Sequence, residues 1–169
     1  MRIAQVIEYI YQVISKILRE NNIEYVKWDV NRSICDWYTP TLPEKRQLEL
    51  PHRYILGLYA LLERLTGEFP DILFEGCCGG GGRFDAGMLY YCPQIWCSDD
   101  TDAHERTVIQ YGTSFFYPIS TVGSHVSAVP NHQTGRVTSI RTRGTVAMAG
   151  SFGYELDLTK LSEEDHAIV

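Results

Sequence analysis

Ile23-Glu24-Tyr25-Val26-Lys27-Trp28-Asp29-Val30-Asn31-Arg32, residues 23–32, joins a short apolar run to a charged and polar cluster. The run predicts a β-strand over residues 23–29, which places Asp29 at the carboxyl end of the strand. Lys27 and Arg32 on either side favour the ionised form of this carboxylate. A carboxylate between two cations is more often part of a salt-bridged turn than of an active site. This stretch alone therefore favours the salt-bridged turn.

Similar strands recur along the chain and alternate with helices. Strands are predicted at residues 23–29, 72–75, 94–97, 119–126 and 152–158, and helices at 2–21, from Pro51 to Gly67, and at 84–91, 103–111 and 136–148. This alternation predicts an α/β fold with a parallel sheet and helices outside it. An open doubly wound sheet and a (β/α)₈ barrel both fit the pattern. In either fold the functional groups lie at the carboxyl ends of the strands.

Two more clusters follow predicted strands. The first is the loop 76–85, in which Gly79 to Gly82 are four successive glycines. It lacks the third glycine of a dinucleotide fingerprint and the lysine of a P-loop, so nucleotide binding is disfavoured. Bare backbone can instead approach another ligand closely. The second cluster, Ser98 to Asp102, supplies further carboxylates. Two carboxylates at the ends of two parallel strands form the working pair of a glycosidase.

Composition excludes several other classes of protein. The 169 residues carry a net charge of −6 with no basic cluster, which argues against nucleic acid or an anionic membrane as a partner. The chain has no apolar run long enough for a transmembrane span and no signal-peptide pattern at its start, which predicts a cytoplasmic protein. Five cysteines without Cys-x-x-Cys spacing fit neither a disulfide framework nor a zinc site. No metal or cofactor is expected.

Three motifs in sequence order resemble glycoside hydrolase family 36, the α-galactosidases. They read here as Lys27–Arg32, Glu75–Asp85 and Trp96–Ala103. Shorter stretches with the same resemblance are Tyr117–Ser120, Ser124–His132 and Gly150–Glu155. The resemblance covers residues 23 to 160, and three long motifs at compatible spacing make it specific. It implies a retaining enzyme with a (β/α)₈ catalytic domain, also called a TIM barrel.

The resemblance also implies a role for individual residues. Asp29 corresponds to the nucleophile, and Asp99 to the general acid/base. The implied substrate-binding residues are Lys27, Trp28, Asn31, Arg32, Cys77, Cys78, Gly79, Gly80 and Trp96. Among them, Cys77 and the backbone of Cys78, Gly79 and Gly80 correspond to the wall around the galactose 2-hydroxyl. Cys78 departs from the small serine or alanine expected there.

The local chemistry agrees with these two roles. Lys27 beside Asp29 favours an ionised nucleophile. Asp100 and Asp102 beside Asp99 favour its protonated, acidic form, and Trp96 adds desolvation. Asp100 is the main rival for the acid, whereas Asp102 suits the cap of the helix that follows.

The resemblance further implies an incomplete catalytic domain. A whole (β/α)₈ barrel takes about 250 residues, so residues 1–169 are expected to be its C-terminal part, with about five βα units that correspond to strands four to eight. The isolated chain is expected to be inactive. The expected partner is a galactoside oligosaccharide of the melibiose or raffinose type, and the full-length parent is expected to form a homo-oligomer, such as a tetramer. The alternatives are an α-N-acetylgalactosaminidase and a non-catalytic sugar-binding fragment.

Overall fold

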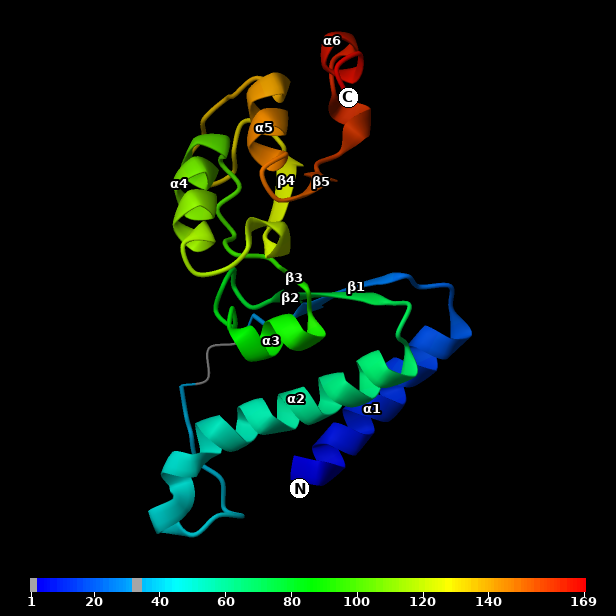
Figure 1. The fold of residues 1–169 in the computed structure, drawn as a ribbon, viewed down its shortest axis with the longest axis vertical. Coiled ribbons are helices and arrows are strands. Elements are labelled where there is room, and N and C mark those ends of the chain that lie inside the picture. Colours follow the sequence, from blue (N-terminus) through cyan, green and yellow to red (C-terminus); the bar gives the residue numbers. More distant parts are fainter. Residues whose placement is uncertain (1–2, 32–34) are drawn as a thin grey trace.

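A computed structural model describes residues 3–31 and 35–169 and has an α/β fold with parallel strands (Figure 1). Each strand is followed by at least one helix. The α-helices and strands are, in chain order, α1 (Ile3–Glu20), β1 (Tyr25–Asp29), α2 (Leu50–Glu68), β2 (Leu73–Cys77), α3 (Ala86–Tyr91), β3 (Gln94–Ile95), α4 (Ala103–Ser114), β4 (Gly123–Ser127), α5 (Ile140–Ala147), β5 (Ser151–Glu155) and α6 (Glu163–His166). Short 3₁₀ helices, η1 (Glu44–Glu49), η2 (Ile119–Thr121) and η3 (Leu158–Lys160), lie in the connections.

The strands lie side by side in chain order. β1 pairs with β2 and β2 with β3, and β4 pairs with β5, all in parallel. An isolated parallel bridge between Ile95 and Val122 links the end of β3 to the residue before β4. The register places Lys27 opposite Glu75 and Asp29 opposite Cys77. The carboxyl ends of neighbouring strands, with the predicted clusters, therefore lie along one edge.

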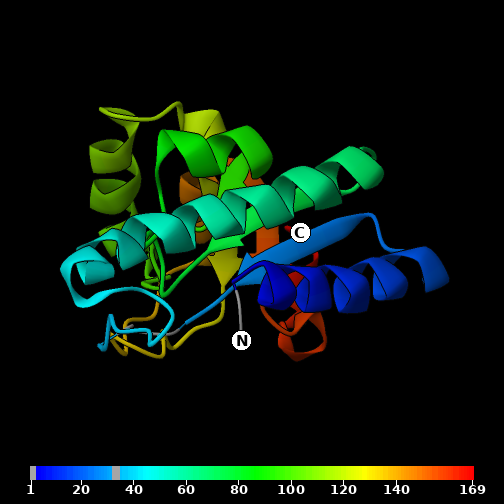
Figure 2. The same cartoon turned by 90° about the horizontal axis from the view of Figure 1, so that it is seen from below.

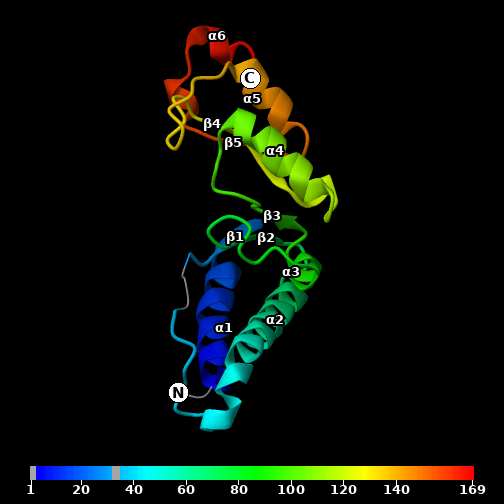
Figure 3. The same cartoon turned by 90° about the vertical axis from the view of Figure 1, so that its left-hand side faces the viewer.

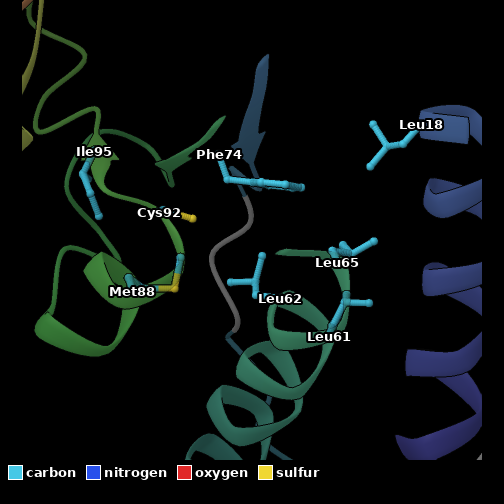
Figure 4. Packing of buried hydrophobic residues seen from close by; sticks show 8 residues of the cluster. All are labelled: Leu18, Leu61, Leu62, Leu65, Phe74, Met88, Cys92 and Ile95. Atoms are coloured by element: carbon cyan, nitrogen blue, oxygen red, sulfur yellow. The ribbon is translucent and has the colours of Figure 1, made fainter. Parts of the chain in front are cut away.

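Helices α1 and α2 pack together and lie on one face of the first three strands (Figure 2). Pro51 lies in the first turn of α2, where its missing N–H has no helical partner to lose. Leu61, Leu62 and Leu65 of α2 belong to the same buried apolar cluster as Phe74 of β2 (Figure 4). The other buried members of this cluster are Leu18, Met88, Cys92 and Ile95. The core thus fixes the strands that carry Asp29 and Cys77.

Helices α4 and α5 pack on the other two strands, toward the opposite end of the long axis from α1 and α2 (Figure 3). The prediction of a strand over 119–126 was wrong in its first part, because Ile119–Thr121 form η2. The predicted helix over 136–148 is shorter, since Ser139 caps α5. In the residues that the structure describes, no helix is long and apolar enough to cross a membrane.

Candidate active site

Asp29 ends β1 on the same strand face as Lys27, since alternate residues share a face. Its side chain is exposed and accepts a hydrogen bond from Asn31 Nδ2 at 2.8 Å. Trp28 lies on the opposite strand face and packs against the apolar core. The Asp29 carboxylate and Lys27 thus lie on one face of β1, and the Trp28 indole lies on the other.

Lys27 makes its ion pair with the next strand and not with Asp29 as the sequence suggests. Its Nζ lies 3.5 Å from Oε1 of Glu75, whose side chain is fully buried. Glu75 also accepts hydrogen bonds from the Tyr25 hydroxyl and, at 2.8 Å, from Gln94 Nε2. Burial raises the pKa of Glu75, against the opposing effects of His125 and of the Gln94 hydrogen bond. The strand register that places Lys27 opposite Glu75 explains this pairing.

The glycine loop contacts the loops on both sides of it. Gly79 N donates to Asn31 Oδ1 at 2.5 Å, and Cys78 Sγ donates to the Val30 carbonyl at 3.1 Å. On the other side, a Cβ added to Gly80 would lie 2.9 Å from the Cα of Ser98 and 3.0 Å from Asp99 N. Gly80 also has a φ of +75°, a conformation that suits glycine. The glycine loop therefore connects the segment after Asp29 to the segment that carries Asp99.

In the turn after β3, Asp99 is exposed, whereas Asp100 and Asp102 accept hydrogen bonds from backbone N–H groups. Asp99 is exposed, and its Oδ1 accepts a hydrogen bond from Trp96 Nε1 at 3.1 Å. Asp100 Oδ1 accepts from the backbone N–H of Asp102 at 3.0 Å. Asp102 caps α4 through the backbone N–H groups of its first turn, which confirms the capping prediction. Of the three carboxylates, Asp99 is the one that faces outward without a role in the turn.

Cys77 at the end of β2 is buried beside Asp29. Burial, the largest effect, and the neighbouring carboxylate raise the pKa of its thiol to about 11. The thiol is therefore neutral near pH 7 and suits a hydrogen bond or a steric contact better than attack on a substrate.

The structure thus brings together Lys27, Asp29, Asn31, Cys77, Cys78, Gly79, Gly80 and Asp99. It packs the half-buried Trp28 against the apolar core and buries Trp96, which is 3% exposed. Arg32 lies outside the described residues. Sequence reasoning missed Glu75 as a buried partner of Lys27. The available signal was a single charge within the apolar run 72–75.

The arrangement offers two exposed carboxylates, one at the end of β1 and one in the turn after β3, and the glycine loop contacts the segment next to each. One carboxylate accepts from an amide and the other from an indole N–H. A small cleft of about 180 Å³ opens at the ends of β4 and β5, lined by Thr101, Ser127, Ala128, Pro130, His132 and Glu155. Such a pair of carboxylates suits attack on, and protonation of, a glycosidic bond.

Comparison with known proteins places this geometry in a family. The family model described as Melibiase matches residues 1–169. The α-galactosidase AgaA of Geobacillus stearothermophilus is 60% identical over 160 residues, which make up 95% of this chain and 22% of that protein. The bifunctional α-galactosidase/sucrose kinase AgaSK of Mediterraneibacter gnavus is 59% identical over 95% of this chain and 16% of that protein. The chain spans about a fifth of the length of such curated relatives.

Solved structures agree with the sequence comparison. A crystal structure of AgaA superposes with a TM-score of 0.93 at 58% identity and covers 97% of this chain and 23% of that chain. The α-galactosidase of Lactobacillus brevis gives a TM-score of 0.93 at 53% identity over 97% of this chain and 22% of that one. A family match over every residue, together with this agreement in sequence and fold, shows that the chain belongs to the melibiase family, alongside the family 36 α-galactosidases with which it aligns.

Proposed function

We propose that residues 1–169 carry the two catalytic carboxylates of a retaining α-galactosidase. The observation that carries the proposal is the placement of Asp29 at the end of β1 and of Asp99 in the turn after β3, with the glycine loop in contact with both segments. In this mechanism Asp29 attacks the anomeric carbon while Asp99 gives its proton to the departing oxygen. Asp99 then takes a proton from water, which releases galactose from Asp29 with its α-configuration retained.

The spacing of aspartates in a relative supports this pair. Two crystallised variants of AgaA each replace one aspartate that the other keeps; one is in complex with raffinose and the other with stachyose. The two replaced aspartates lie 70 positions apart in AgaA, and Asp29 and Asp99 are also 70 positions apart. Loss of a catalytic carboxylate slows cleavage by orders of magnitude, which allows an intact oligosaccharide to persist in a crystal.

The remaining site residues receive roles that follow their positions. Lys27 and Asn31 share the edge with Asp29 and are proposed to hydrogen-bond sugar hydroxyls. Cys77 and the backbone of residues 78–80 are proposed to form the wall at the 2-hydroxyl. This wall is close-packed against residues 97–99, which favours a hydroxyl over a bulkier acetamido group. Trp28 and Trp96 are not included among the proposed sugar contacts, because Trp28 packs against the apolar core and Trp96 is buried behind Asp99.

The order of the strands supports an arc of a (β/α)₈ barrel. All pairings are parallel and follow chain order, and the bridge between Ile95 and Val122 continues the order across the two sheets. A doubly wound sheet reverses its strand order at a switch point, whereas a barrel keeps it. We therefore propose that the chain is the C-terminal part of a barrel and supplies its strands four to eight. The cytoplasmic location and the homo-oligomeric state stay predictions from the sequence.

The test uses a hybrid enzyme, called the AgaA hybrid, in which residues 1–169 replace the matching segment of AgaA. A mechanism-based fluorogalactoside should label Asp29, as peptide mapping would reveal. The hybrid should cleave raffinose and a nitrophenyl α-galactoside but not the corresponding α-N-acetylgalactosaminide. Label on another residue would refute the nucleophile assignment, and binding without cleavage would favour the sugar-binding alternative.

Azide distinguishes the two carboxylates in the same hybrid. Asp99→Ala should lose about 10²–10⁴-fold in kcat/KM on raffinose. With an activated aryl galactoside, azide should then restore turnover and give the α-galactosyl azide, because azide replaces water in the second step. Asp29→Ala with azide should give the β-galactosyl azide, since azide then attacks directly. Asp100→Ala serves as the matched control and should need no rescue. An identical response of Asp99→Ala and Asp100→Ala would overturn the assignment of Asp99.

A further inference from the structure

A stacked pair of rings lies behind Asp99, on the first residue after β3 and on β4. The indole of Trp96 stacks on the imidazole of His125, with ring centroids 4.9 Å apart and planes at 28°. The indole N–H donates to Asp99 Oδ1 at 3.1 Å. His125 Nδ1 in turn lies 3.7 Å from Oε2 of Glu155 at the end of β5. These contacts connect β5 to Asp99 through two rings.

Two glycines leave room for these rings. A Cβ at Gly123 would lie 3.1 Å from the six-membered ring of Trp96, and a Cβ at Gly153 would lie 2.8 Å from Cδ2 of His125. Gly153 is the register partner of His125 in the β4–β5 pair. The absence of a side chain at Gly123 of β4 and Gly153 of β5 therefore leaves the space that the Trp96 and His125 rings occupy.

Cations fix the indole from other directions. Lys27 Nζ and the guanidinium carbon of Arg106 each lie 4.5 Å from the centroid of the Trp96 ring. Arg106 is itself buried and donates to the Ser98 carbonyl at 3.1 Å. With its ring contacted by His125, Lys27 and Arg106, the indole has one orientation in which its N–H meets Asp99. A rigid donor to a carboxylate fixes the direction in which the carboxylate presents its other oxygen.

We propose that His125 is a positioning residue for Asp99, acting through the stacked indole of Trp96, and that Glu155 holds His125 in place. The inference rests on the proposed function, because it assigns His125 to the acid/base half of that site. The indole N–H holds Oδ1 of Asp99, which leaves Oδ2 to carry the proton toward the leaving oxygen. Loss of the stack frees the indole to rotate and lets Asp99 turn away from that oxygen. In the first step, which kcat/KM reports, the loss is confined to the transfer of a proton to the leaving group.

The test compares two leaving groups in the AgaA hybrid. Raffinose needs a proton on its departing oxygen, whereas a dinitrophenolate departs without one. His125→Ala should therefore lower kcat/KM about 10–100-fold on raffinose, within the range that acid catalysis supplies. On dinitrophenyl α-galactoside kcat/KM should stay within about twofold, since this quantity reports only the first step. Trp96→Phe, which keeps a ring but removes the N–H, should give the same selective loss.

Two further variants separate positioning from folding. His125→Phe keeps a flat ring on Trp96 and should recover most of the activity on raffinose. His104→Ala changes an exposed histidine of α4 and should leave both substrates unaffected. An equal loss on both substrates in His125→Ala would show a merely structural role and overturn the inference, as would no loss at all. If Asp99→Ala itself lacked selectivity for raffinose, the proposed function would fail instead.

Discussion

In the first part of the chain, β1 to β3 rest on a cluster of eight buried apolar residues, supplied by α1, α2, β2, β3 and α3 with its C-cap. The buried apolar cluster at β4 and β5 consists of Val126, Ile140 and Ala147. Buried polar groups take the place of the missing apolar ones in the second part. Ser124 Oγ donates to Gln110 Oε1 at 2.7 Å, and Arg143 Nη1 donates to the Ser127 carbonyl at 2.5 Å. β1, which carries Asp29, is therefore supported by apolar packing, whereas β4 and β5 depend on a hydrogen-bonded network. Arg106 joins this network to the turn that carries Asp99 through the carbonyls of Ser98 and Gly123.

The two kinds of support lose stability in different ways when a residue is substituted. Apolar packing is non-directional and loses stability in proportion to the volume removed. A buried hydrogen-bonded network fails when one member leaves its partners unsatisfied. Hydrogen exchange in the AgaA hybrid, read peptide by peptide, measures the free energy of local opening and can follow the two regions separately.

The largest effect is expected from Leu62→Ala in α2. Leu62 is fully buried, so its truncation leaves a cavity and should lower the opening free energy of residues 50–77 by about 2–5 kcal/mol. Exchange in α4 and α5 should stay unchanged. Leu48→Ala, at a position that is 95% exposed, is the control and should change exchange little. Equal weakening of both regions would contradict their separate support.

A smaller and opposite pattern is expected from Arg106→Met. Methionine keeps much of the apolar stem but removes the donors to the carbonyls of Ser98 and Gly123. The buried carbonyl of Gly123 and the partly buried carbonyl of Ser98 lose these hydrogen bonds. This should lower the free energy of local opening by about 2 kcal/mol in α4 and β4 and change it little in α2. Arg141→Met changes an exposed arginine of α5 and serves as the matched control. Loss of protection in α2 would show that the network also supports the first region.

The smallest effect is expected from Asp102→Asn and depends on pH. Burial raises the pKa of Asp102, but hydrogen bonds from Thr134, the N–H groups of Glu105 and His104, and Arg136 outweigh it, so the pKa is lowered overall. A carboxyl with a lowered folded-state pKa stabilises the fold above its unfolded value of about 3.9 and loses this effect as the pH falls through the folded value.

Asp102→Asn should therefore weaken α4 by about 1–2 kcal/mol at pH 7, since charge-assisted hydrogen bonds are lost. The difference from the unsubstituted hybrid should narrow as the pH falls below about 4, as the carboxyl loses its charge. Hydrogen exchange of residues 103–114, compared between variant and unsubstituted hybrid at pH 7 and below about pH 4, measures this difference. Asp71→Asn, at an exposed position, should alter exchange little. A difference that grows toward low pH would contradict a lowered pKa of Asp102 in the folded state.

The sequence predicted features that depend on local patterns. Three such features each depend on a few neighbouring residues: the apolar stripe of α1, the proline in the first turn of α2 and the Asp102 cap of α4. The alternation of Lys27, Trp28 and Asp29 also held the information that the indole lies on the opposite face, because successive strand residues point to opposite sides. That signal was available in the sequence and was overlooked.

Other features depend on strand register, which local patterns leave open. The ion pair of Lys27 with Glu75 arises because these two residues are opposite each other in β1 and β2. In the same way His125 meets Gly153 across β4 and β5, which makes room for its stack on Trp96. These residues are far apart in the sequence, and nothing in its local patterns indicates that they share a level in the sheet.

The close approach of Gly80 to Ser98 also bears on how the scaffold tolerates change. Because backbone meets backbone there, no side chain exists whose replacement could adjust the gap between the two loops. The spacing of the strands then sets the distance between the loops, and substitutions of individual side chains do not change it. In the proposed enzyme, the sugar preference can change through residues at the rim of the site, while the spacing of the two carboxylates, on which the stereochemical outcome depends, stays constant.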